Sequence, residues 1–150
     1  MSRKVLILNG PNLNMLGTRE VEIYGKETLA DIDKSCREYG RDLGLEIDFR
    51  QSNAEAELVT WIQQARGTVE AIILNAGAYT HTSIAILDAL KMVEVPVVEV
   101  HLSNIFQREP FRAESYVSRA AKGIIAGFGA HGYRLALDAI SQLIGAGTKK

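Results

Sequence analysis

The sequence predicts an α/β fold with a parallel sheet, and two observations carry this prediction. Short runs rich in Val, Ile and Leu recur along the chain of 150 residues, and amphipathic stretches with helical periodicity separate them. Uninterrupted apolar runs are typical of strands that are buried on both faces. A helix between successive strands supplies the crossover that parallel pairing needs.

The expected strands are five apolar runs: Val5 to Leu8, Leu45 to Phe49, Ala71 to Leu74, Val97 to Val100 and Ile124 to Phe128. Right-handed crossovers between them place helices on both faces of the sheet, which gives three αβα layers. For five parallel strands, the flavodoxin-like doubly wound order is the most economical topology.

The first helix is predicted between Thr28 and Gly44. Thr28 is a suitable N-cap, and a glycine such as Gly44 is a suitable residue to end a helix. The apolar residues between them step by three and four, as one face of a helix requires. These residues are Leu29, Ile32, Cys36, Tyr39 and Leu43.

Three more helices are predicted further along the chain. Ser52 and Glu55 have the spacing of a capping box, so the second helix should begin there. The third should begin near Ser83. The apolar residues that mark these helices are Leu58, Ile62 and Ala65 for the second, Ile84, Leu87 and Leu90 for the third, and Ala136, Ile140 and Leu143 for the last.

The segment from Asn9 to Gly25 is long for a simple connection. It reads NGPNLNMLGTREVEIYG and begins directly after the first apolar run. Pro11 has no N–H to donate, so the strand cannot continue through it. Loops longer than about 12–15 residues are usually functional or disordered. We therefore predict that residues 17–26 form a lid over a site.

Composition and charge indicate the general class of protein to which this chain belongs. With 47% apolar residues, residues 1–150 suffice for a single domain with a sizeable core. The net charge is -1 and no basic cluster occurs, which argues against a nucleic-acid partner. No apolar run reaches the roughly 18 residues of a membrane span, and a lone Cys36 cannot form an internal disulfide. We expect a soluble, cytoplasmic protein.

Polar residues gather where the predicted strands end. In a doubly wound sheet these ends share one crevice, so residues far apart in the sequence meet there. The mixture of amides, hydroxyls, imidazoles, a phenol and guanidiniums suits a small polyhydroxylated anion. The candidates are Asn9, Asn12, Arg19, Tyr24, Asn75, Tyr79, His81, Glu99, His101, Ser103, Asn104, Arg108 and Arg112.

Glu99 and His101 are a candidate acid/base pair. They lie two residues apart on a predicted strand, so both side chains point to the same face. The carboxylate could then orient the imidazole. Each histidine of the chain could alternatively be a polar residue at a strand end that only makes structural hydrogen bonds.

Two other motifs suggest cofactors or metals. The GFGAHG motif (residues 127–132) matches the glycine pattern of dinucleotide-binding loops. That fingerprint needs an acidic residue about 20 positions later, which is absent, so we interpret the glycines as a tight turn with close helix packing. No Walker A motif occurs. The three histidines have no metal-ligand spacing, and we predict no metal site.

At this point the motifs resemble the type II 3-dehydroquinate dehydratases, also called type II dehydroquinases. The motifs, in order along nearly the whole chain, are NGPNLN (9–14), GTREVEIYG (17–25), NAGAYTHTS (75–83), EVHLSN (99–104) and REPFR (108–112). The resemblance implies a flavodoxin-like fold, a dodecamer of four trimers and no cofactor. It also implies the trans dehydration of 3-dehydroquinate to 3-dehydroshikimate, in the shikimate pathway of aromatic amino acid biosynthesis.

The resemblance assigns catalytic roles that the chemistry can rationalise. Elimination through an enolate needs a base, a stabiliser of the enolate oxygen and an acid. Tyr24 would be the base, although a phenol is a poor base at neutral pH unless positive charge favours the phenolate; Arg19 and Arg108 could supply that charge. Asn12 would hold a water against the enolate oxygen. The acid for the departing hydroxyl would be His101, oriented by Glu99.

The resemblance also assigns substrate contacts. The substrate hydroxyls would be held by Asn75, His81 and Arg112. The carboxylate would meet the Ser103 hydroxyl and the N–H groups of Leu102 and Ser103. Asp88 would reach a neighbouring subunit's site, a role that sequence alone would not suggest.

One residue departs from the family pattern, which commonly has proline where this chain has Val21. Two rival functions make different demands on the sequence. An unrelated enzyme type performs the same reaction through a Schiff-base lysine, but no lysine follows a predicted strand here. A flavodoxin-like binding or signalling module would need a flavin loop or an acidic phosphoacceptor after the first strand.

Overall fold

A five-stranded parallel sheet lies at the centre of the computed structural model, which describes residues 3–18 and 20–145. The strands are β1 (Arg3–Asn9), β2 (Leu45–Gln51), β3 (Ala71–Asn75), β4 (Val97–His101) and β5 (Gly123–Ala126). Their order is β2-β1-β3-β4-β5, and every pairing is parallel. The predicted doubly wound, flavodoxin-like order is therefore confirmed.

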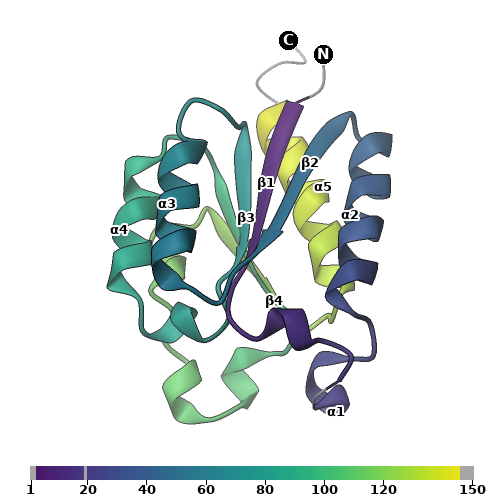
Figure 1. Ribbon diagram of the computed structural model, residues 1–150, viewed down its shortest axis with the longest axis vertical. Helices are drawn as coiled ribbons and strands as arrows, with labels where there is room; N and C mark the ends of the chain where they lie inside the picture. Colours follow the sequence, from purple (N-terminus) through teal and green to yellow (C-terminus); the bar gives the residue numbers. More distant parts are fainter. Residues whose placement is uncertain (1–2, 19, 146–150) are drawn as a thin grey trace.

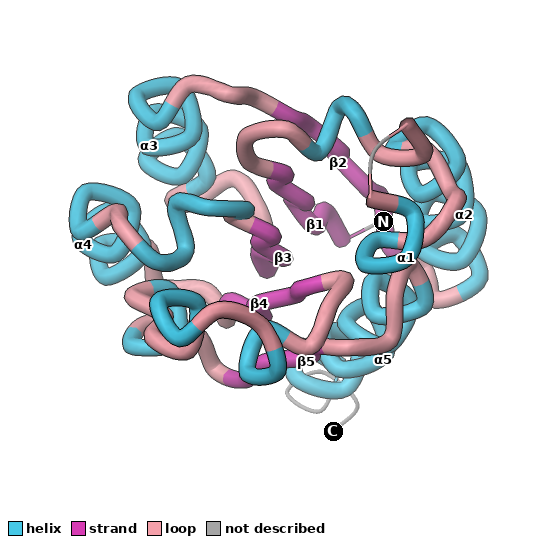
Figure 2. The backbone as a smooth tube through the Cα atoms, turned by 90° about the horizontal axis from the view of Figure 1, so that it is seen from below, coloured by secondary structure: helices cyan, strands magenta, loops and turns pink. Residues whose placement is uncertain are grey.

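Helices cover both faces of this sheet (Figure 1). The longer helices are α2 (Leu29–Asp42), α3 (Glu55–Ala65), α4 (Ile84–Met92) and α5 (His131–Gly145). The view along the sheet shows α2 and α5 on one face and α3 and α4 on the other (Figure 2). Each face has its own apolar core, one built around Ile7 and Leu137 and the other around Leu8 and Ile62. This is the predicted three-layer arrangement.

The first predicted helix has the predicted ends. The Thr28 hydroxyl accepts a hydrogen bond from the Asp31 N–H, and the Asp31 carboxylate accepts one from the Thr28 N–H, which makes a capping box. Asp42 is the last helical residue, and Gly44 follows in the left-handed conformation at φ 76°. The same kind of N-cap starts α4, where the Ser83 hydroxyl accepts from the Ile86 N–H.

The capping box predicted at Ser52 and Glu55 is wrong. The N-cap of α3 is Ala54, and no side chain caps that helix. The Ser52 hydroxyl instead accepts from the Ala54 N–H and donates to Glu57 at 2.6 Å. Ser52 lies directly after β2, so it stabilises the turn before the helix rather than its first turn.

Three other expectations need correction. The last strand ends at Ala126 rather than Phe128, because Gly127 turns the chain at φ 99°. Ile84 and Leu143 were expected to mark inward faces, but both side chains are exposed. The other predicted residues of these two helices, Leu87, Leu90, Ala136 and Ile140, are buried as expected, and Ile86 and Leu137 are buried with them.

The long segment after β1 contains local structure. It forms a 3-10 turn, η1 (Leu13–Met15), and a single helical turn, α1 (Val21–Tyr24). In Figure 1, α1 lies at the bottom of the molecule, below the start of α2. The chain therefore places Tyr24 at the end of the molecule where β1 and β3 also finish.

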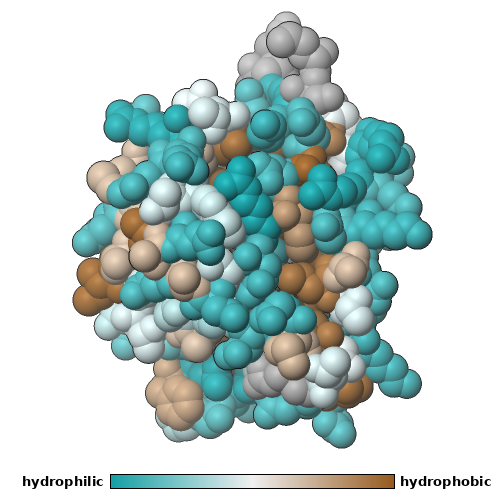
Figure 3. All heavy atoms as spheres, viewed as in Figure 1, coloured by the Kyte–Doolittle hydropathy of each residue, from teal (hydrophilic) through white to brown (hydrophobic). Residues whose placement is uncertain are grey.

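Hydrophilic side chains cover much of the face seen in Figure 1, and the apolar groups between them are small (Figure 3). Across the described ranges, no helix has the length and apolar character that crossing a membrane would demand.

Candidate active site

A cavity of about 100 Å³ opens where β1, β3 and β4 end. It brings together nine of the residues that the sequence predicted for the site: Asn12, Tyr24, Asn75, His81, His101, Leu102, Ser103, Arg108 and Arg112. Pro11 and Gly77 also line it. The doubly wound topology explains the convergence, because carboxyl ends of parallel strands share one edge.

Gly10 lets the first and third strand ends approach each other. A Cβ atom on Gly10 would lie 2.3 Å from the backbone oxygen of Ala76, which is far inside contact distance. The Gly10 N–H donates to the backbone carbonyl oxygen of Asn75 at 2.8 Å. This close pairing of two backbones, next to the lining residues Pro11 and Gly77, requires a residue without a side chain.

His101 and Glu99 make the predicted contact. The His101 Nε2 lies 2.5 Å from a carboxylate oxygen of Glu99, and both side chains are buried. Because a carboxylate can only accept, Nε2 carries the proton of this bond. Nδ1 is then the ring nitrogen left to act on a substrate in the cavity that His101 lines.

Two serines that the sequence analysis missed complete this group. The Ser115 hydroxyl donates to the Glu99 Oε2 at 2.7 Å, and the Ser118 hydroxyl donates to Oε1. Burial disfavours the charged form of Glu99, but the bonds from His101, the positive charge of that residue and the two serines outweigh it and lower the pKa of Glu99. Glu99 is thus held as a carboxylate that orients His101.

His81 faces the same cavity from the other side. Its Nδ1 lies 2.8 Å from the Glu114 backbone oxygen, so Nδ1 carries a proton and Nε2 does not. The His81 and His101 rings are stacked with centroids 6.5 Å apart. Burial and the neighbouring positive charges of His101 and Arg112 outweigh the bond to Glu114 and lower the pKa of His81. A neutral His81 can accept a hydrogen bond from a substrate hydroxyl.

Tyr24 and Arg108 meet at the mouth of the cavity. The Arg108 Cζ lies 5.1 Å from the centroid of the Tyr24 ring, and Arg108 also donates to the Ser103 hydroxyl at 3.3 Å. One of the two predicted sources of positive charge is therefore beside the phenol. Arg19, the other source, lies outside the described residues.

Asn12 lies at the exposed edge of the cavity. Its backbone is left-handed at φ 70°, and its side chain does not cap the 3-10 turn that follows. Asn12 therefore does not use its side chain to cap this turn. Its own N–H is held by the Asn53 side chain at 3.0 Å. The amide of Asn12 remains available to a ligand or a water.

The GFGAHG motif supports the strand end that carries His101. The Gly127 N–H donates to the backbone carbonyl oxygen of His101, and the Gly129 N–H donates to that of Leu102 at 2.9 Å. Both glycines have positive φ, and a Cβ atom on Gly127 would lie 3.3 Å from Asn104. These contacts support the interpretation of a tight turn with close packing.

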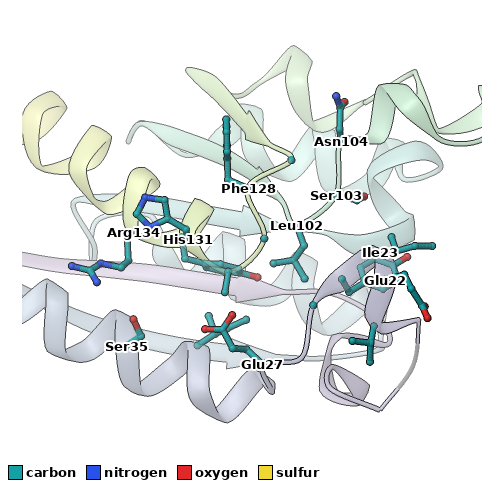
Figure 4. A pocket seen from close by; sticks show the side chains of 18 of the residues that line it. Glu22, Ile23, Glu27, Ser35, Leu102, Ser103, Asn104, Phe128, His131 and Arg134 are labelled. Carbon is teal, nitrogen blue, oxygen red and sulfur yellow. The ribbon is translucent and has the colours of Figure 1, made fainter.

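A larger groove adjoins the cavity between α1, α2 and α5 (Figure 4). Its volume is about 740 Å³. It shares Tyr24, Leu102, Ser103 and Arg108 with the smaller cavity, so the two are parts of one opening. Figure 4 shows Glu22 and Ile23 on the α1 side and His131 and Arg134 on the α5 side. A movement of α1 would widen or narrow this opening.

Five predicted residues of the described ranges do not line the cavity: Asn9, Tyr79, Asp88, Glu99 and Asn104. Asn9 is buried, the Tyr79 hydroxyl donates to the Asn53 carbonyl oxygen at 2.7 Å, and the Asn104 side chain accepts from the Phe106 N–H. Glu99 is fully buried behind His101, as an orienting residue must be. Asp88 lies on α4 with an exposed side chain, away from the cavity of its own chain. Within the described part of the chain, no three His, Cys, Asp or Glu side chains are grouped so that they could hold a metal ion.

Fold and site together define a class of protein: a flavodoxin-like α/β protein with a polar cavity and a buried pair of Glu99 and His101 at the carboxyl ends of its strands. Residues 3–141 match the family described as Dehydroquinase class II. The chain is 56% identical to 3-dehydroquinate dehydratase 2 of Pseudomonas aeruginosa over 142 residues, which cover 95% of this chain and 96% of that protein. This chain belongs to the class II dehydroquinase family.

Solved structures agree with this assignment. The type II dehydroquinase of Propionibacterium acnes superposes with a TM-score of 0.91 at 46% identity, covering 95% of this chain and 98% of that one. The type II dehydroquinase of Butyrivibrio crossotus gives the same TM-score at 41% identity, covering 93% and 97%.

Proposed function

We propose that this protein is a 3-dehydroquinate dehydratase that forms 3-dehydroshikimate through an enolate, in the shikimate pathway. The observation that carries the proposal is the cavity itself, which Tyr24 and Arg108 line together with His101, the residue that Glu99 holds from behind. Family membership supports the same reaction.

The first step is proton removal. The Tyr24 phenolate accepts the proton on the carbon next to the substrate ketone, and the electron pair moves to the ketone oxygen as an enolate. The positive charge of Arg108 beside the ring stabilises the phenolate. Asn12 holds a water that donates a hydrogen bond to the enolate oxygen.

The second step is loss of water. The enolate electrons return, the carbon–oxygen bond of the leaving hydroxyl breaks, and His101 Nδ1 donates a proton to that oxygen. Glu99 keeps the opposite ring nitrogen protonated and so presents Nδ1 to the substrate. One proton has passed to Tyr24 and one has left His101, so the enzyme is restored when a proton passes from the phenol to the imidazole.

Binding is assigned to the remaining lining residues. Asn75, His81 and Arg112 hold the substrate hydroxyls, and Ser103 with the N–H groups of Leu102 and Ser103 holds the carboxylate. No cofactor takes part in this proposal. The lysines of the described ranges do not line the cavity, which supports a mechanism without a Schiff base.

We further propose that residues 17–26 act as a lid on a single domain. Arg19 belongs to this lid by its place in the sequence and would add a second positive charge at the Tyr24 ring on closure. Gly17 and Gly25 flank α1 at φ 87° and 90°, where the chain can change direction at low cost. A cytoplasmic location stays a prediction of the sequence.

The proposed assembly is a dodecamer of four trimers, with Asp88 reaching a neighbouring subunit's site. Asp88 lies on α4 between Ile84 and Met92, one turn from each, so the three share a face. The two apolar side chains are 56% and 52% exposed. A carboxylate flanked by exposed apolar residues suits a face that another subunit covers.

The decisive test mixes the protein with 3-dehydroquinate and follows the ultraviolet absorbance of the conjugated enone. Wild type should turn over, and Tyr24→Phe should bind substrate with turnover reduced at least about 100-fold, as loss of a general base predicts. Tyr39→Phe is the matched control, because Tyr39 lies on α2 outside the cavity.

Each outcome has a separate meaning. Full activity of Tyr24→Phe would remove Tyr24 as the base, whereas an inactive wild type would remove the proposed function. Borohydride added during turnover should trap nothing on the protein; a trapped adduct would favour the Schiff-base mechanism instead.

A further inference from the structure

A buried tyrosine on α5 connects two asparagines behind the cavity. The Tyr133 hydroxyl donates to the Asn9 Oδ1 at 2.6 Å, and the Asn75 Nδ2 donates to the Tyr133 hydroxyl at 3.0 Å. Tyr133 is 1% exposed, and the asparagines end β1 and β3 with no more than 3% exposed. Of the three, Asn75 lines the active-site cavity.

Backbone groups at both ends determine the direction of this chain of hydrogen bonds. The Arg50 carbonyl can only accept, so Asn9 presents its Nδ2 there, at 2.9 Å. The Asn9 Oδ1 then faces Tyr133, which must donate. At the other end, the Gly77 N–H can only donate, and it meets the Asn75 Oδ1 at 3.3 Å. Asn75 therefore turns its Nδ2 toward Tyr133.

We propose that Tyr133 is a positioning residue, whose hydroxyl holds the Asn75 amide in one orientation so that the same oxygen and N–H always face the substrate. A hydroxyl is suited to this place because it donates and accepts at once. A turned amide would set an N–H against the Gly77 N–H and lose that bond. The inference rests on the proposed function, in which Asn75 holds a substrate hydroxyl.

The surroundings of Tyr133 favour a neutral, fixed phenol. Burial raises the pKa of the Tyr133 hydroxyl, which opposes its ionisation. Its ring packs against Phe49 with the centroids 6.3 Å apart, within the apolar core. The ring can therefore stay in place when the hydroxyl is removed. Tyr133→Phe keeps the ring in the core and deletes the two hydrogen bonds, and it leaves the buried Asn9 Oδ1 without this donor, so the variant's free energy of unfolding should be measured alongside its kinetics.

The test is a double-mutant cycle on turnover of 3-dehydroquinate. Tyr133→Phe should lower kcat/KM about tenfold, the size of a typical net hydrogen bond, mainly by raising KM. In an Asn75→Ala background the same change should cost less than about twofold, because the amide that Tyr133 orients is gone. Tyr39→Phe, which loses a bond to Asp138, is the control and should match wild type.

Two kinetic outcomes would overturn the inference. One is a Tyr133→Phe variant with wild-type kcat/KM, and the other is a loss that is undiminished without the Asn75 amide, which would indicate a purely structural role.

A neutron crystal structure of Tyr133→Phe, in which deuterium atoms distinguish the amide nitrogen from the oxygen, supplies a readout that does not depend on turnover. We expect the Asn75 amide to be rotated or to occupy two orientations. An Asn75 side chain that still meets the Gly77 N–H alone, in one orientation, would count against positioning by Tyr133. Should wild type fail to dehydrate 3-dehydroquinate, the proposed function falls, and this structure still decides the positioning.

Discussion

The Glu99 carboxylate has no solvent exposure, yet it is the charged group on which the His101 orientation depends. Burial penalises its charge, and three donors compensate: the imidazole and the hydroxyls of Ser115 and Ser118. A protonated Glu99 could present a donor to His101 and release the ring tautomer. The two serines therefore maintain the orientation of His101, the proposed acid.

Ser118→Ala removes one of these donors. We expect the free energy of unfolding to fall by about 1–3 kcal/mol at pH 7, the usual value of a hydrogen bond to a charged group. Urea titration measures this change. Ser141→Ala, near the far end of α5, is the control and should stay within about 0.5 kcal/mol of wild type.

The sign of the pH dependence follows from the lowered pKa of Glu99. Such a carboxyl contributes stability above its unfolded pKa, near 4.5, and loses it as the pH falls through the lower folded value. The difference between wild type and Ser118→Ala should therefore shrink below about pH 4.5, because a neutral carboxyl gains less from the donor. A difference that is constant down to acid unfolding would contradict this account.

The helical turn α1 carries Tyr24, the proposed base, as its last residue. Val21 is its first residue, a place where proline fits a helix. Glu20 before it is left-handed at φ 41°, however, and a proline favours extended geometry in the preceding residue. The valine at this position is thus compatible with a lid path that proline would disfavour.

Val21→Pro should change the kinetics without abolishing activity. Proline restricts the open lid by about 0.4–1 kcal/mol of chain entropy but also acts on the Glu20 backbone. We expect KM and kcat to shift about two- to fivefold. Val21→Ala, which keeps the N–H, should stay closer to wild type. Unchanged kinetics together with unchanged protease sensitivity of residues 17–26 would show that this position does not control the lid.

The parallel sheet brings the residues of the cavity together at one edge of the whole molecule. The exposed face of α4 is proposed to contribute Asp88 to the cavity of a neighbouring subunit. Asp88→Asn should lower kcat/KM about tenfold, as loss of one charge-assisted contact predicts. Tyr24→Phe should be nearly inactive. Light scattering should show dodecamers for wild type and both variants, and a monomeric wild type would remove the assembly.

Refolding the two variants together tests whether Asp88 acts across subunits. In a mixed trimer, an Asp88→Asn chain keeps its own Tyr24 and receives Asp88 from a Tyr24→Phe neighbour. Activity should therefore exceed the sum of the two separate samples. Simple additivity after mixing would place Asp88 in its own subunit's site or outside catalysis. Refolded Tyr24→Phe mixed with Tyr39→Phe is the control for dilution.

The order of strands and most of the cavity could be predicted because the signals are local. Apolar runs mark β1 to β5, and polar residues directly after them fall at one edge of the sheet. The end of β5 could not be predicted, since the apolar Phe128 continues the pattern while Gly127 has already turned the chain. The cap at Ser52 failed because the Ser52 hydroxyl donates to Glu57, while the Glu55 carboxylate accepts from Ser83, which is distant in the sequence.

By itself, the sequence determined the doubly wound fold, the family and the residues that meet at the strand ends, because periodicity and short motifs are properties of neighbouring residues. The hydrogen-bond partners that hold those residues in place became visible only in the tertiary structure. Ser115, Ser118 and Tyr133 act through hydrogen bonds to residues 16 or more positions away, and no local pattern marks a buried hydroxyl as a donor to a distant side chain. These hydrogen bonds can form only after the helices have packed on the sheet.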